Sequence, residues 1–170
     1  MGLDVSAYCG VELIDVCDLD TWEAKHDWEE TVHIWPALIE KTPFPEQLRG
    51  SDLKPNGVYE YKDRMGFRAG SYSGYGRWRA WLSRFFMGAE PQDVWTNPAD
   101  FRNKPFFFLA NFSDCEGIIA GDAVRKLCED FAAHRERVHK MGWSVGFVRV
   151  YDLFHNAFAM AVHDGFVEFH

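Results

Sequence analysis

The sequence predicts an α+β fold in which a largely antiparallel sheet packs against about three helices. Two observations predict this class: stretches that alternate apolar and polar residues gather before residue 72, and stretches with apolar residues three and four positions apart dominate after it. Alternation is typical of half-buried strands, and the wider spacing is typical of amphipathic helices. The chain has 170 residues and no internal repeat, so we expect residues 1–170 to form a single domain.

The predicted strands lie mostly in the first part of the chain. Residues 3–8 alternate, and residues 11–16 are expected to pair with them through a tight turn. Residues 32–35 are expected to form a third short strand, which a proline ends. Residues 57–61 and 66–70 flank a short polar segment, so they predict a β-hairpin.

Other segments carry weaker signals. Residues 18–31 are acidic and predict a loop or a short irregular helix. Residues 43–56 and 89–104 hold prolines and scattered polar residues, so both predict loops. Residues 105–109 are apolar on both faces, which predicts a short buried strand.

Three helices are predicted from the spacing of large apolar residues. The first ends near Gly88. Its aromatic face comprises Tyr75, Trp78, Leu82, Phe85 and Phe86. The second runs from Asp122, a candidate cap, to about Lys140. The third ends at Gly165, and residues 166–169 then form a closing strand inside the sheet.

The overall charge bounds the class of protein. A net charge of −8 argues against non-specific nucleic-acid binding, which needs a basic surface. No apolar run approaches the ~20 residues that cross a bilayer, and the first residues lack the pattern of a signal peptide. We therefore expect a cytoplasmic protein with no membrane partner and no direct nucleic-acid partner.

The cysteine pattern predicts free thiols. The four cysteines, at positions 9, 17, 115 and 128, are widely spaced and form no CxxC pair. In a reducing compartment such cysteines are expected to be unpaired and mostly buried. We expect neither a metal site nor a cofactor from this pattern.

A basic segment interrupts the acidic chain. Residues 62–84 contain six basic side chains and one acidic side chain, whereas residues 1–60 contain 13 acidic and 4 basic side chains. Two interpretations remain open. The arginines either pair with the acidic first third of the chain or form an anion site.

The first candidate site lies in this segment, over residues 70–79, where a predicted strand meets a predicted helix. Free N–H groups at a helix start, two hydroxyls and an arginine are equipped to hold a phosphate, and tyrosine rings stack on bases. The alternative is a corner that one serine caps. The candidate ligand-binding residues are Ser71, Tyr72, Ser73, Tyr75 and Arg77.

Two further clusters are polar. In residues 111–117, Asp114 and Glu116 are candidates for binding a cation, an amine or a guanidinium, and Cys115 is a nucleophile if a histidine lies beside it. The alternative is a self-capped turn. At the C-terminus, alternation places Glu168 and His170 on one strand face, as half of a metal site or as a solvated terminal histidine.

Four stretches together resemble a family of small uncharacterised proteins from phages, prophages and bacteria. They are residues 1–8 (MGLDVSAY), 67–78 (FRAGSYSGYGRW), 112–117 (FSDCEG) and 167–170 (VEFH). The family carries no assigned activity. The resemblance therefore implies a phage or mobile-element setting and transfers no catalytic role.

Three functional hypotheses follow. The first is a phage-type, non-enzymatic binding protein that engages a host factor or a signalling nucleotide, with a counter-defence role and a small anionic ligand or a host protein as partner. The second is a small hydrolase or transferase that uses Asp114, Cys115, Glu116 and a nearby histidine such as His170. The third is an acidic protein-interaction module, whose binding weakens with salt.

Overall fold

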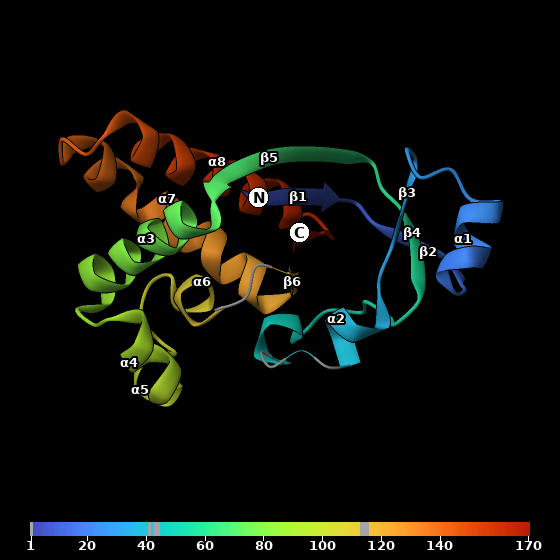
Figure 1. The fold of residues 1–170 in the computed structure, drawn as a ribbon, viewed down its shortest axis with the longest axis horizontal. Helices are drawn as coiled ribbons and strands as arrows, with labels where there is room; N and C mark the ends of the chain where they lie inside the picture. The colour runs from blue at the N-terminus through green and yellow to red at the C-terminus, as the bar shows by residue number, and fades with distance from the viewer. Residues whose placement is uncertain (1, 41, 43–44, 113–115) are drawn as a thin grey trace.

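The computed structural model describes residues 2–40, 42, 45–112 and 116–170. The fold is α+β, with two antiparallel sheets and a layer of helices (Figure 1). The larger sheet joins β5, β1, β7 and β6 in that order, and the smaller sheet joins β2, β4 and β3. Among the residues described, no helix has the length and apolar character needed to span a bilayer.

The elements have the following bounds. The strands of the larger sheet are β1 (Gly2–Cys9), β5 (Asp63–Ser71), β6 (Gly117–Ala120) and β7 (Phe166–Phe169). Those of the smaller sheet are β2 (Glu12–Val16), β3 (Thr31–His33) and β4 (Gly57–Glu60). The helices are α1 (Leu19–Lys25), α2 (Pro36–Glu40), α3 (Tyr72–Leu82), α4 (Pro91–Thr96), α5 (Pro98–Phe101), α6 (Phe107–Asn111), α7 (Asp122–Lys140) and α8 (Val145–Ala161). A 3₁₀ turn, η1 (Pro45–Leu48), and a π-helical turn, η2 (Ser83–Met87), complete the set.

The first and last strands of the chain lie side by side at the centre of the larger sheet. β1 pairs antiparallel with β5 along its whole length and with β7 over residues 5–8. Leu3, Val5 and Ala7 of β1 face the helices and are at most 1% exposed. The residues between them face the opposite side, because side chains alternate along a strand. The chain therefore terminates inside a sheet, as the sequence predicts.

An aromatic core joins the larger sheet to α3, α7 and α8. Its fully buried members include Tyr75, Phe131, Tyr151, Phe154 and Phe158. The predicted positions of α7 and α8 are confirmed, and their apolar faces repeat at the helical period. The cap predicted at Asp122 is wrong, because Gly121 is the N-cap of α7 and Asp122 is its first helical residue. α3 continues into η2 and ends at Gly88, also as predicted. Gly88 has φ of 71°, a conformation that glycine adopts without strain.

Both hairpins predicted from the sequence are wrong. β1 does not pair with β2, because the N–H groups of Gly10 and Val11 donate to the carbonyls of His163 and Asp164 after α8, at 2.7 and 2.8 Å. These hydrogen bonds direct the chain after β1 away from the larger sheet and toward the smaller one. β4 and β5 likewise belong to different sheets. Local spacing does not reveal which distant strand offers the complementary face.

The segment between η2 and β6 is mostly helical, so the loop predicted for residues 89–104 and the strand predicted for 105–109 are also wrong. α4 and α5 each begin at a proline, which is tolerated there because the first helical N–H has no intrahelical partner. Phe106 has φ of 62° and donates its N–H to Asp130 Oδ2 at 2.9 Å, just before α6. A short apolar run fits a buried helix as well as a strand.

The smaller sheet covers part of the second face of the larger sheet. Ile118, Ala120 and Phe166 pack there with Val32 and Ile34. The strand predicted near residue 32 is β3, and the acidic segment contains the short helix α1. The far end of the larger sheet, near the C-terminus, lies outside this apolar cluster.

Alanine at Gly165 should be strongly destabilising. Its Cβ would lie 1.9 Å from the Tyr8 carbonyl oxygen, which cannot move without disturbing β1. Gly76 in α3 is the matched control, because a Cβ there meets nothing within 4 Å. In urea denaturation we expect Gly165→Ala to lose about 3 kcal/mol and Gly76→Ala to gain about 0.5–1 kcal/mol. Equal stabilities of the two variants would contradict this packing.

Candidate functional site

Described residues of the three polar clusters found in the sequence lie at one end of the larger sheet. Ser71, the last residue of β5, pairs with Gly2 at the start of β1. His170 exchanges two backbone hydrogen bonds of 2.9 Å with Asp4. The start of β6 pairs with the end of β7. Segments that are distant in the sequence are therefore neighbours here.

The strand-to-helix corner of the first cluster caps itself. Ser71 is the N-cap of α3, and its Oγ accepts a hydrogen bond from the Gly74 N–H at 3.1 Å. Ser73 Oγ lies 3.3 Å from Ser71 Oγ. Tyr72 is 39% exposed and Arg77 is exposed, so a ligand can reach both side chains.

Tyr75 is packed in the core instead. It is 2% exposed, and its ring centroid lies 5.8 Å from that of Phe154 and 6.4 Å from that of Phe169. It cannot stack on a ligand unless the core opens. The guanidinium of Arg79 lies 5.6 Å from the Tyr75 ring and donates to the Phe112 carbonyl. Arg79 thus joins α3 to the segment before β6.

The second cluster is described only in part. Asp114 and Cys115 lie outside the described residues. Glu116 is exposed and directly precedes β6. The next residue, Gly117, pairs with Phe169 in an antiparallel ladder.

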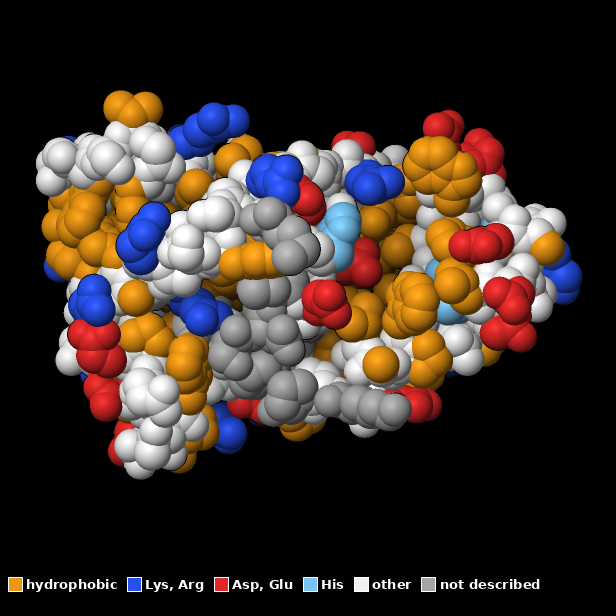
Figure 2. Space-filling view, in the orientation of Figure 1, with side chains coloured by type: hydrophobic (Ala, Val, Ile, Leu, Met, Phe, Trp, Pro, Cys, Tyr) orange, Lys and Arg blue, Asp and Glu red, His pale blue; other side chains and the backbone are white. Residues whose placement is uncertain are grey.

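One side of the larger sheet carries polar side chains. Two of them, Ser6 and Tyr8, are buried, at 2% and 5% exposed, and Tyr8 also packs in the apolar cluster with the smaller sheet. We call this side the polar face. It comprises Asp4, Ser6, Tyr8, Arg64, Arg68, Glu168 and His170. They share this side because residues paired across strands point the same way. Ser6 Oγ and His170 Nε2 are 3.0 Å apart. In Figure 2, a histidine and an acidic side chain lie together where the molecule is hollowed between its two lobes.

Glu168 is the polar-face carboxyl whose pKa lies near neutral pH. Burial raises the pKa of its carboxyl to about 7, against the opposing effects of the Arg64 charge and a hydrogen bond with Tyr8. Burial also raises the pKa of Tyr8 to about 12, so its hydroxyl keeps its proton. None of the ion pairs formed by the described residues includes Glu168. At neutral pH this carboxyl can donate or accept a proton.

Two arginines, Arg64 and Arg68, lie beside two carboxyl groups, those of Asp4 and Glu168, on the polar face. The Arg64 guanidinium lies 5.5 Å from the centroid of the Tyr8 ring. Arg68 is 3.8 Å from the Asp4 carboxylate, and these two side chains are 60% and 49% exposed. Exposed pairs of this kind contribute only about 0–1 kcal/mol. A ligand can therefore recruit Arg68 at little cost.

A separate cavity of about 620 Å³ lies between β2, the 50–54 segment, the start of α7 and the end of α8. That volume is in the range of small-molecule sites. No polar-face residue lines it, and its charged residues are Asp52, Lys54, Arg125 and Asp164. Because two acidic and two basic residues line this cavity, its charge does not favour either an anionic or a cationic ligand.

Ser6 and Tyr8 were missed as candidate residues by sequence reasoning, which considered Arg64 and Arg68 only as part of the basic segment 62–84. The alternation of residues 3–8 was a usable signal, because it places Ser6 and Tyr8 on one face. No pattern in the sequence predicts the contact between Ser6 and His170. The two residues are 164 positions apart, and closure of the sheet alone brings them together.

Comparison with protein-family models, curated proteins and solved structures gives no significant match to this chain. Function is therefore inferred from the polar face. It combines a hydroxyl, an imidazole and two guanidinium groups with one carboxyl that titrates near neutrality. Such a set can bind an anion or transfer a proton.

Replacing Glu168 with glutamine should remove a pH-dependent loss of stability. The carboxyl has a pKa of about 7 in the folded protein against an ordinary value of 4.5. As pH rises, the unfolded chain therefore releases this proton first. The native protein should lose up to about 3 kcal/mol between these two values and not regain it above them.

The measurement is urea denaturation of both proteins at several pH values. Ionisable groups common to both cancel in the difference, so only Glu168 contributes to it. We expect Glu168→Gln to become the more stable protein as the pH increases. Parallel stability profiles would show that this carboxyl is not buried as described.

Proposed function

We propose that this protein is a non-enzymatic binding protein of the phage type that engages a signalling nucleotide or a host factor in the cytoplasm. Its ligand is a small anion that lies on the polar face. The observation that carries the proposal is the convergence of two arginines and the Ser6–His170 pair around one half-buried carboxyl, Glu168. A counter-defence role follows if the ligand is a nucleotide signal of the host.

Charge and hydrogen bonding favour an anion. Arg64 and Arg68 are exposed on β5, an edge strand of the larger sheet. The exposed His170 ring, whose Nε2 lies 3.0 Å from Ser6 Oγ, offers a further hydrogen bond. Glu168 becomes an additional donor when it is protonated, below pH of about 7. Hydrogen bonds between charged partners are shorter and stronger than neutral ones.

An aromatic ring beside these groups favours a nucleotide over a simple phosphate. Tyr61 is partly exposed, and its ring centroid lies 5.2 Å from that of Tyr8. Arg64 lies over the same Tyr8 ring. A base stacked on Tyr61 would thus keep its phosphate within reach of the arginines.

Ligand binding should depend on the polar face. A panel of nucleotides and cyclic nucleotides is screened first by thermal shift, where a ligand at about 100 times its dissociation constant raises the melting temperature by about 5–10 °C. For the best ligand, Arg64→Ala combined with His170→Ala should weaken binding at least about 10-fold, because each charge-assisted contact contributes about 1.5–3 kcal/mol.

The matched control combines Tyr72→Ala with Arg77→Ala, two accessible side chains at the start of α3. We expect its affinity to equal that of the wild type. Loss of binding in this control alone would place the site at residues 70–79 instead. If no member of the panel shifts the melting temperature of the wild type, small-anion binding is contradicted.

A hydrolase or transferase is the second candidate, favoured by the 3.0 Å contact between Ser6 Oγ and His170 Nε2. His170 would accept the Ser6 proton during attack, and protonated Glu168 would serve as an acid. Ser6 is only 2% exposed, which makes this the weaker proposal. The enzymatic hypothesis from the sequence uses Asp114 and Cys115, which lie outside the described residues, together with His170.

Two variants separate these nucleophiles. If Ser6 attacks, Ser6→Ala should lower turnover of ester or phosphodiester substrates by about 100-fold or more, while Cys115→Ser leaves turnover unchanged. The opposite result would assign the role to Cys115. A wild-type protein that turns over neither substrate class would remove the enzymatic candidate.

A further inference from the structure

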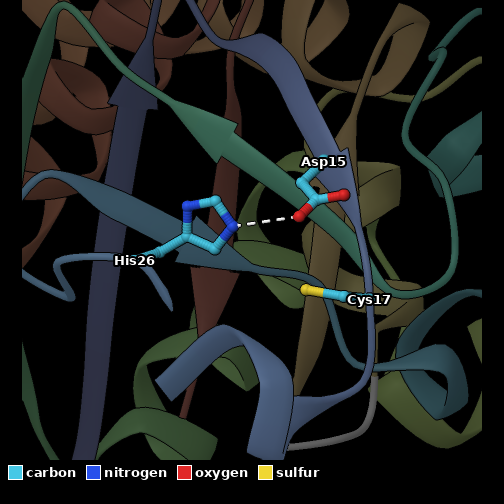
Figure 3. Close-up of side chains that lie close together, drawn as sticks. All are labelled: Asp15, Cys17 and His26. Carbon is cyan, nitrogen blue, oxygen red and sulfur yellow. Dashed lines mark hydrogen bonds and ion pairs between the residues drawn. The ribbon is translucent and has the colours of Figure 1, made fainter. Parts of the chain in front are cut away.

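A second group of reactive side chains lies in the lobe of the smaller sheet. Asp15 lies near the end of β2, Cys17 directly follows β2, and His26 directly follows α1. Together they bring a carboxylate oxygen, a sulfur and a ring nitrogen within 4.8 Å of one another. Asp15 Oδ2 and His26 Nε2 are 3.1 Å apart. Figure 3 shows the three side chains pointing into one space from two separate segments. Among the described residues, no other group of this kind is as close.

The backbone holds each of these side chains in place. Asp15 and Cys17 are two positions apart in an extended segment, so they point the same way. The Cys17 N–H donates to the Asn56 carbonyl at 3.0 Å, and the His26 N–H donates to the Trp22 carbonyl at 2.9 Å, at the end of α1. Asp15 Oδ1 accepts the N–H of the next residue, which leaves Oδ2 turned toward His26.

A buried histidine supports the group from behind. His33 is 4% exposed, and its Nε2 lies 2.8 Å from the Cys17 carbonyl oxygen. Its ring stacks on Trp22 with centroids 5.5 Å apart. Supporting contacts of this kind orient the ligands of metal sites. Here they tie the Cys17 segment to β3 and to α1.

Few contacts hold helix α1 on the smaller sheet. It has seven residues, and none of them is fully buried. A helix of this length is marginal in water unless tertiary contacts hold it. Trp22 donates its ring N–H to Thr31 Oγ1 at 2.9 Å, and the His26–Asp15 pair adds a partly exposed contact. A bound ion would join the end of α1 to β2.

We infer that Asp15, Cys17 and His26 bind a divalent transition-metal ion, for which Zn²⁺ is the best fit. Thiolate, imidazole and carboxylate are the ligands that zinc uses in proteins. The two anionic ligands together neutralise a dication. Tetrahedral zinc with bonds of about 2.0–2.3 Å separates its ligand atoms by roughly 3.3–3.8 Å. The present spacing therefore needs to contract by only on the order of 1 Å.

The ion would keep one exchangeable position. The side chains of Asp15 and His26 are 36% and 18% exposed, so the site opens to solvent. Three protein ligands leave a fourth position for water. An activated thiol is the less well supported alternative, because burial and the nearby Asp15 charge raise the pKa of Cys17.

The test is a titration of the untagged full-length protein with Co²⁺ alone. Thiolate-bound tetrahedral Co²⁺ gives a near-ultraviolet charge-transfer band and intense visible bands, and we expect both to saturate at one ion per chain. Cys17→Ser should abolish the charge-transfer band. Cys128→Ser, which replaces another free and partly buried cysteine, is the matched control and should leave the band unchanged.

Asp15→Asn and His26→Gln should each weaken Zn²⁺ binding at least about 10-fold. Circular dichroism of the metal-free variants checks that they fold. Zn²⁺ at about 100 times its dissociation constant should raise the melting temperature of the wild type by about 5–10 °C and leave that of Cys17→Ser unchanged. A wild-type protein that binds no Co²⁺, or a charge-transfer band that survives Cys17→Ser, would overturn the proposal.

Discussion

The pairing of β1 with β7 is the interaction on which the rest of the structure depends. These strands are the first and last of the chain, and they occupy the centre of the larger sheet. Their closure brings Gly165 so close to Tyr8 that no Cβ fits between them. Because side chains alternate, one register fixes both sides of the sheet: Val5 enters the aromatic core while Ser6 reaches the polar face.

The proposal for the polar face follows from how the two sheets are joined. The smaller sheet packs over only part of the larger one, so Glu168 lies at the border between an apolar interface and an open surface. That position desolvates the carboxyl while Arg64 and Arg68 stay exposed. The Asp15, Cys17 and His26 group serves a different need, because it concerns how a short helix is held on the smaller sheet.

Local signals in the sequence were informative where structure is local. The period of α7 and α8 and the closing strand are set by residues within a few positions of each other, and both are confirmed. The sequence left a cap by Ser71 or Ser73 as one alternative for the corner before α3, and Ser71 is the N-cap. Strand partners were not predictable, because β1 chooses strands more than 50 and 150 positions away. The conformation of Phe106 depends on a carboxylate from α7. The alternation of β1 and β7 predicts which of their residues share a side of the sheet. That the two strands lie next to each other could not be predicted from the sequence.

The ionisation of Glu168 tests the role of the polar face most directly. A carbon-13 NMR titration of glutamate-labelled protein follows this carboxyl, and Glu168→Gln identifies its signal. We expect a midpoint near pH 7 that moves upward when inorganic phosphate is added, because a nearby anion disfavours the charged carboxylate. A midpoint close to the ordinary value of 4.5, unmoved by phosphate, would contradict both the burial of Glu168 and its place in an anion site.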